Sequence, residues 1–314
     1  MNLNKSTKIW INYGIGAVLA CILLWSIWND VKVQLAQSEG GWDNYSWQSA
    51  DIYIAVFLLP VNVMLEGYKW HLLVSEVQPA SYGSSLKSVL VGIALSILTP
   101  NRIGEYPGRI LYLRKNKTIR LIGVSVLGAL SQFITLFIFG CIGLAYYTMH
   151  FSNAYDIIVL SLASCVLLAL LALFFFQKRL LKYLSSLKWP RRMPVYIYLI
   201  KKISTRQQFQ IVGLSMLRYL VFTAQYIILL HWIGITFSLG LVFLSFLFFW
   251  AMAVIPSFAL AELGIRGKLS LFLFLHLTTD TIGVLTATLG LWCINLIIPA
   301  IAGSILTFKM RLIR

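Results

Sequence analysis

Long uninterrupted apolar runs constrain this chain more than any other feature of its sequence. The clearest extend over 123–147 and 157–176, and each reaches the roughly 20 residues that a helix needs to cross a bilayer. Only 11% of the residues are charged, against about 25% in a soluble domain. This composition excludes a soluble enzyme, a secreted disulfide scaffold and a disordered chain, and it predicts a membrane protein.

The net charge of +16 reflects orientation in a membrane rather than binding of nucleic acid. Its 26 Lys and Arg residues are grouped along the chain, and cytoplasmic loops of membrane proteins carry such an excess. Residues 178–206 hold nine basic residues and no acid, and both termini are basic. We therefore place the protein in the inner (cytoplasmic) membrane, with both termini and the loop 178–206 in the cytoplasm.

The positions of the charges order the apolar segments into two halves of opposite orientation. The full spans expected are 9–28, 51–74, 119–149, 157–177, 207–233 and 283–307. Segments 86–114 and 240–277 begin and end on one side of the membrane, so each is expected to form a re-entrant hairpin. The predicted fold class is all-α: a polytopic inner-membrane protein with about six full spans plus two re-entrant helical hairpins in two inverted-topology repeats.

These elements are expected to form a single integral membrane domain over residues 1–314. The first inverted repeat covers about 1–149 and the second about 156–314. One alternative concerns 240–258, which is long enough to cross the membrane by itself. Residues 269–277 would then have too few residues to return across the bilayer unless they merged with the next segment.

Each expected hairpin is interrupted by a proline, a glycine and a Glu–Arg pair with a spacing of four. Proline lacks an amide hydrogen and glycine permits unusual dihedral angles, so a helix stops there. A helix that restarts after Pro100 would offer unpaired N–H groups and a partial positive charge, which suit a phosphate. Inverted repeats with broken helices are typical of transporters that bind substrate near the midplane. The alternative is that each Glu–Arg pair only neutralises itself.

Polar side chains also occur inside two of the full spans. Asn62, Glu66 and Lys69 share one face of 51–74, and Ser215, Arg218 and Gln225 share one face of 207–233. Charges in hydrocarbon are costly, so they face the interior of a bundle and are candidates for function. The candidate substrate-binding residues are Pro100, Asn101, Arg102, Gly104, Glu105, Arg109, Arg218, Pro256, Glu262, Gly264 and Arg266, with Asn62, Glu66, Lys69 and Gln225 in support.

Other polar and aromatic residues have more ordinary interpretations. Ser131 and Gln132 are expected to join packed helices by hydrogen bonds. Trp47, Trp70 and Trp232 lie near predicted membrane interfaces, where tryptophan is common. The sequence contains no serine elbow, no zinc-binding HExxH and no phosphate-binding loop. We therefore expect no catalytic residue, no metal site, no cofactor and no enzymatic activity.

The first break resembles a pattern of a known family. Residues 98–105 read LTPNRIGE and are followed by Arg109, which is similar to the TP-x-R-x-GE-x-x-R pattern of the transmembrane domain of lysylphosphatidylglycerol synthases and their stand-alone flippase-like relatives. The stretch 255–266 loosely resembles that family's P-G-G-x-G-x-R-E pattern, although Ser257 and Phe258 replace glycines there. Residues 66–70, EGYKW, look like its basic-aromatic element, with Lys69 in place of Arg.

The resemblance implies a flippase-like transporter that moves an anionic or aminoacylated phospholipid, or a lipid-linked headgroup, between leaflets. The arginines expected to hold the lipid phosphate are Arg102, Arg109, Arg218 and Arg266. Glu105 and Glu262 would hold those arginines or a cationic headgroup. The aminoacyl-transferring domain of the full-length synthases is not found in this sequence.

The expected partners are accordingly a phospholipid or lipid-linked substrate within the membrane, and a separate lipid-modifying enzyme, but no nucleic acid. The oligomeric state is not predicted. Two other functions remain open at this point. One is a membrane-embedded transferase, or its subunit, acting on polyprenyl-phosphate carriers. The other is an ion or small-solute carrier.

Overall fold

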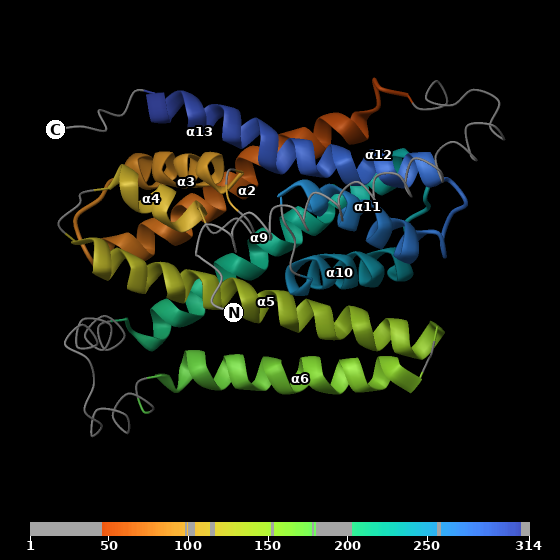
Figure 1. Cartoon of the computed structure of the whole chain (residues 1–314), viewed down its shortest axis with the longest axis horizontal. Coiled ribbons are helices and arrows are strands. Elements are labelled where there is room, and N and C mark those ends of the chain that lie inside the picture. Colours follow the sequence, from red (N-terminus) through yellow and green to blue (C-terminus); the bar gives the residue numbers. More distant parts are fainter. Residues whose placement is uncertain are drawn as a thin grey trace, which may run out of the picture.

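The structure is a computed structural model that describes residues 46–97, 99, 104–113, 117–151, 154–177, 179, 203–255 and 259–308. Within these ranges every regular element is a helix (Figure 1). The expected first span 9–28 and most of the basic loop 178–206 lie outside the described residues.

Among the described residues, five helical segments are long and apolar enough to cross a membrane. They are α2 (Ala50–Ser75), α5 (Thr118–Phe151), α6 (Ala154–Phe175), α9 (Thr205–Trp232) and the continuous segment formed by α12 (Thr281–Trp292), the π-helix η4 (Cys293–Ile297) and α13 (Ile298–Phe308). Each coincides with a span expected from the sequence. The all-α, polytopic membrane class is therefore confirmed.

Two pairs of shorter helices stand where the hairpins were expected. The first pair is α3 (Tyr82–Ser96) with α4 (Glu105–Tyr112), and the second is α10 (Leu239–Val254) with α11 (Ala259–Phe274). At 16 residues, α10 and α11 are each about 24 Å long, shorter than the roughly 30 Å of hydrocarbon. Helix α10 ends at Val254 and packs against α11, so 240–277 forms two short helices; their return to the same side of the membrane stays a prediction. The inverted-repeat relation stays a prediction.

Polar caps fix where several of these helices begin. Ser49, Ser81, Ser204 and Ser238 each accept a hydrogen bond from a backbone N–H in the first turn of the helix that follows. At α9 the cap is reciprocal, because the side chain of Gln207 accepts from the backbone N–H of Ser204. The apolar runs thus decide which segments become helices, and these caps decide their first residues.

The helices α2 and α9 lie against each other through the middle of the molecule, with α3 and α4 at one end of the long axis and α10 and α11 at the other (Figure 1). Helix α5 packs on α10 and α9, and α6 covers the outer side of α5. Helix α3 packs between α2, α4 and α13. Helix α4 packs on α3 and α5, each of which also packs on α2.

Glycine lets α4 approach α3 closely. A Cβ atom placed on Gly108 would lie 2.8 Å from the Cα of Gly92. A Cβ atom on Gly92 would lie 2.6 Å from Cγ of Arg109 and 2.7 Å from the carbonyl oxygen of Glu105. The small residues on both helices thus determine how deeply Glu105 and Arg109 enter the bundle.

Candidate functional site

A buried carboxylate on α2 gathers three cations from three helices. Glu66 is only 4% exposed. Its Oε2 lies 2.8 Å from Nζ of Lys69 and 2.8 Å from Nη1 of Arg218, and its Oε1 lies 2.7 Å from Nη1 of Arg109. Arg109 also pairs with Glu105, as the spacing of four predicts. We call Glu66, Lys69, Glu105, Arg109 and Arg218 the charged cluster.

Helix α5 adds neutral acceptors to the charged cluster. Oε1 of Gln132 accepts hydrogen bonds from Nζ of Lys69 at 3.0 Å and from Nη1 of Arg218 at 3.2 Å. Nζ of Lys69 also donates to Oγ of Ser215 at 3.4 Å, and that hydroxyl lies 2.9 Å from Oγ of Ser131. Gln132 therefore contacts two cations, which is more than the packing role expected for it.

The last transmembrane segment reaches the charged cluster through two asparagines. Oδ1 of Asn62 accepts a hydrogen bond from Nε of Arg218 at 2.8 Å. Nδ2 of Asn62 in turn donates to Oδ1 of Asn295 at 3.2 Å. Asn295 lies in the π-helix η4, and short π-helical segments are frequent at functional sites. Asn295 was not among the residues predicted from the sequence, although an amide in an apolar span is the same signal that singles out Asn62.

An aromatic ring supports Arg109. Its guanidinium carbon lies 5.5 Å from the ring centroid of Trp70, a distance at which cation and ring attract. Trp70 is buried, and its Nε1 donates to Oγ of Ser88 at 2.6 Å. The interface position expected for Trp70 is therefore wrong. Trp47 and Trp232 contact each other at 5.0 Å, near the start of α2 and the end of α9.

The charged cluster carries a net charge of +1 when its five groups are ionised, because three cations face two carboxylates. Buried charges need partners, since desolvation is costly. Nε of Arg109 has no hydrogen-bond partner among the described residues. The side chains of Arg218 and Glu105 keep 24% and 25% of their exposure, whereas the other three keep 7% or less. An anion would therefore reach the cations of the charged cluster from the side on which Arg218 and Glu105 are exposed.

Several predicted site residues are not tested by this arrangement. Pro100, Asn101, Arg102 and Pro256 lie outside the described residues, and the same holds for the side chain of Glu262. Gly104 is described and forms the N-cap of α4. The Glu262–Arg266 pair thus stays a prediction.

Three other predicted residues lie away from the charged cluster. Gly264 and Arg266 belong to α11, which packs chiefly against α10 and α12. Gln225 lies two helical turns beyond Arg218 on α9, and its Nε2 donates to the backbone oxygen of Ala55 at 2.8 Å. In the part of the chain that the structure describes, no three His, Cys, Asp or Glu residues gather as a metal site would require.

Comparisons with known proteins give one finding. The family model described as "Lysylphosphatidylglycerol synthase TM region" matches residues 11–303. No curated protein and no solved structure matches the chain significantly. The match covers all of the helices that build the charged cluster.

Proposed function

The chain belongs to the family of the lysylphosphatidylglycerol synthase TM region, and from this premise we propose that it is a flippase-like transporter of an anionic or aminoacylated phospholipid, or of a lipid-linked headgroup. The observation that carries the proposal is the charged cluster. Its three cations come from α2, α4 and α9 and have only two carboxylates to share. Helices α2 and α9 are long and apolar enough to span a membrane, so lipid headgroups are among the anions that can reach the charged cluster.

Charge balance favours a phosphodiester as the ligand. A lipid phosphate brings one negative charge and would neutralise the net +1 of the charged cluster. Arginine suits this ligand, because its planar fork of donors matches the oxygens of a phosphate. Arg218 offers the more accessible guanidinium, and Glu105, which is accessible to a similar degree, would accept the ammonium of an aminoacylated headgroup.

Transport would follow from competition for the arginines. Without substrate, Glu66 holds Arg109 and Arg218 together and so joins α4 to α9 across α2. A lipid phosphate that takes over one arginine weakens this link, and a ligand shifts a conformational equilibrium by as much as its affinity differs between the two states. Rocking of one half against the other would then expose the site to the opposite leaflet.

The same proposal sets the cellular context. We place the protein in the inner membrane with both termini in the cytoplasm, as the basic residues of the loop 178–206 suggest. The substrate would be supplied by a separate lipid-modifying enzyme, because no catalytic motif occurs in this sequence. We propose no enzymatic activity for the chain itself.

The proposal can be tested by reconstituting the chain in liposomes and measuring leaflet exchange of labelled phosphatidylglycerol and phosphatidylcholine. We expect faster exchange of phosphatidylglycerol, and we expect Arg218→Gln to lower that rate at least tenfold. Arg206→Gln is the matched control, because Arg206 lies on the same helix but is exposed in its first turn. Wild-type exchange by a folded Arg218→Gln variant would overturn the proposal.

The same preparation distinguishes the two other functions. A transferase acting on polyprenyl phosphate would form a new lipid product from a labelled donor. A solute or ion carrier would show uptake or conductance that is independent of lipid composition. Either result, without leaflet exchange, would replace the proposed function.

A further inference from the structure

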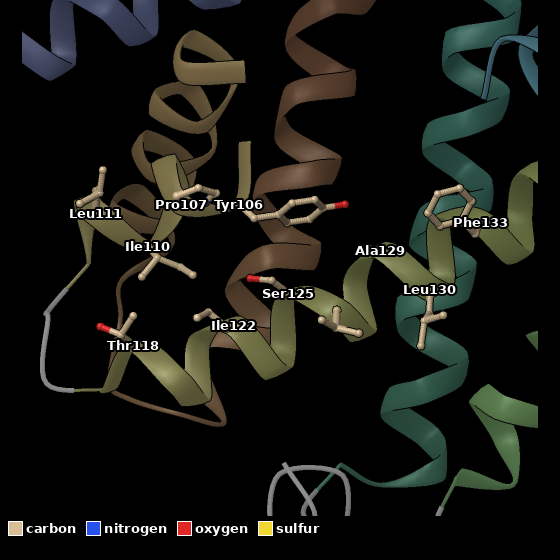
Figure 2. Close-up of a pocket in the computed structure, with 11 residues that line it drawn as sticks. Tyr106, Pro107, Ile110, Leu111, Thr118, Ile122, Ser125, Ala129, Leu130 and Phe133 are labelled. Atoms are coloured by element: carbon tan, nitrogen blue, oxygen red, sulfur yellow. The ribbon is translucent and has the colours of Figure 1, made fainter. Parts of the chain in front are cut away.

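An almost wholly apolar groove of about 800 Å³ lies between α4 and α5 (Figure 2). Tyr106 and Ile110 line it from α4, and Val126, Leu130 and Phe133 line it from α5. Its volume lies within the roughly 300–1,000 Å³ that small-molecule sites occupy. The hydroxyl of Ser125, which also lines the groove, donates to the backbone oxygen of Leu121 and is satisfied there. The lining therefore favours a hydrocarbon ligand.

The groove opens toward the surroundings of the bundle. Val126 is 50% exposed and Phe133 is 43% exposed, and both belong to α5, which is long and apolar enough to span the membrane. Over that part of a spanning helix the surrounding solvent is lipid. Acyl chains are therefore the hydrocarbon that reaches this groove without leaving the membrane.

The groove adjoins the charged cluster on α4 and the cluster's neutral neighbour Gln132 on α5. On α4, Glu105 and Arg109 pair with charged partners, whereas the residue after each, Tyr106 and Ile110, lines the groove. Successive residues of a helix point about 100° apart, so such neighbours face adjacent directions. On α5, Gln132 contacts a cation of the charged cluster, whereas the next residue, Phe133, lines the groove.

Tyr106 stands at the border between the two regions. Figure 2 shows its ring extending from α4, with the hydroxyl at the end farthest from that helix. Tyrosine combines an apolar ring with a polar tip, and it is common at membrane interfaces, where one end of the side chain meets an apolar medium and the other meets water. Tyr106 thus offers an apolar ring to an acyl chain and a hydroxyl to the headgroup attached to it.

We propose that this groove holds one acyl chain of the lipid whose anionic headgroup binds at the charged cluster. The proposal rests on the proposed function and deepens it by adding the site of the chain. The groove extends along α5 from Thr118 to Phe133, about 22 Å at the rise of a helix. One leaflet offers about 15 Å of hydrocarbon, so a whole acyl chain fits.

The groove also explains how a charged headgroup can be held at membrane depth. A chain that stays in an apolar groove loses no contact with hydrocarbon while its headgroup leaves the membrane surface. The chain is in an apolar medium both in the groove and in the bilayer, so its transfer between them changes the hydrophobic free energy little. The groove therefore orients the lipid, and the charged cluster supplies the preference for an anion.

Photocrosslinking tests the proposal directly. The purified chain is reconstituted with phosphatidylglycerol that carries a diazirine in the middle of one acyl chain, and labelled peptides are located by mass spectrometry. We expect labelling within 106–133, reduced at least fivefold by Ala129→Trp, which fills the groove. Ala145→Trp is the control, since Ala145 lies on α5 beyond the groove with the same intermediate exposure. Labelling that is equal in the two variants would overturn the proposal.

A second probe links the groove to the headgroup. Phosphatidylcholine with the same diazirine chain carries no net charge and should label residues 106–133 several-fold less. Equal labelling by the two lipids would overturn the link to the charged cluster. Groove labelling that is lost in Ala129→Trp, together with leaflet exchange that is unaffected by Arg218→Gln, would overturn the proposed function and leave the chain site standing. Leaflet exchange that depends on Arg218, without labelling of the groove, would overturn the chain site and leave the proposed function standing.

Discussion

Glu66 is the residue on which the charged cluster depends, because it is the only one that touches all three cations among the described residues. Removal of one partner from a buried ion pair leaves charge uncompensated in a medium that solvates it poorly. Glu105 remains, but it pairs with Arg109 alone among those three cations. The consequences of losing Glu66 should therefore exceed those of losing an ordinary surface charge.

The first prediction concerns Glu66→Gln. We expect this variant to lose about 3–5 kcal/mol of stability, the usual cost of breaking a buried pair, as measured by the midpoint of thermal unfolding in detergent micelles. Asp51→Asn on the same helix is the control. Asp51 pairs with the exposed His231, and exposed pairs contribute about 0–1 kcal/mol.

A double variant separates charge imbalance from lost packing. Glu66→Gln combined with Lys69→Met restores the net charge of the cluster, so part of the lost stability should return. Equal unfolding midpoints for Glu66→Gln and Asp51→Asn would contradict the role assigned to Glu66.

Gln132 is the second residue with a testable role. Gln132→Leu removes the acceptor shared by Lys69 and Arg218, and a buried donor left without its acceptor costs about 1–3 kcal/mol. Gln177→Leu is a matched control, because the buried Nε2 of Gln177 has no partner within the described structure. We expect a clear drop in the unfolding midpoint for Gln132→Leu only. A drop of the same size in both variants would argue against a role in holding the cations.

At the scale of the elements, the contact between α3 and α4 determines where Arg109 lies. Gly92→Ala places a methyl group against Cγ of Arg109 and the backbone of Glu105. Overpacking of this kind costs about 1–3 kcal/mol, and it should also displace α4 and slow leaflet exchange. Gly83→Ala on the same helix meets nothing within 4 Å and should leave both stability and exchange unchanged. Normal exchange in Gly92→Ala would show that the position of α4 is not critical.

Element boundaries were largely predictable because the apolar runs are long. The segment expected at 207–233 is a helix over Thr205–Trp232, and the one at 119–149 is a helix over Thr118–Phe151. The π-helix η4 was not predictable, since it changes the hydrogen-bond register without changing the apolar pattern. Trp70 was misplaced for a related reason. Its position near the end of a span suggests the interface, whereas the contacts of α3 bury it.

At the scale of the whole molecule, the spacing of polar residues predicted which of them share a helix face, but it did not predict which distant residues contact that face. The 3.6-residue repeat puts Asn62, Glu66 and Lys69 on one side of α2. It does not say that Arg109, 43 positions from Glu66, and Arg218, 152 positions from it, meet that face. Those contacts follow from how α2, α4 and α9 pack, which depends on shape complementarity between distant segments. The site was therefore predictable as a set of buried charges but not as a cluster.

Orientation in the membrane is a whole-molecule prediction that thiol labelling can check. With the native cysteines replaced, Lys188→Cys in the basic loop should react only from the cytoplasmic side. Thr279→Cys, between α11 and α12, should react only from the opposite side. The measurement is labelling of spheroplasts and inverted vesicles by a membrane-impermeant maleimide. Labelling of both positions from one side would contradict the predicted topology.

The central claim is that the charged cluster recognises an anionic lipid headgroup, and lipid binding measures this most directly. The measurement is the apparent Kd of the purified chain for phosphatidylglycerol and for phosphatidylcholine, obtained by native mass spectrometry. Both lipids bring a phosphodiester, but phosphatidylcholine also brings a quaternary ammonium that the net +1 of the charged cluster disfavours, and like-charge juxtaposition costs several kcal/mol. The wild type and Arg206→Gln should therefore prefer phosphatidylglycerol by roughly tenfold or more, and Arg218→Gln should lose that preference. Equal affinity of the wild type for both lipids, or an unchanged preference in Arg218→Gln, would contradict the account.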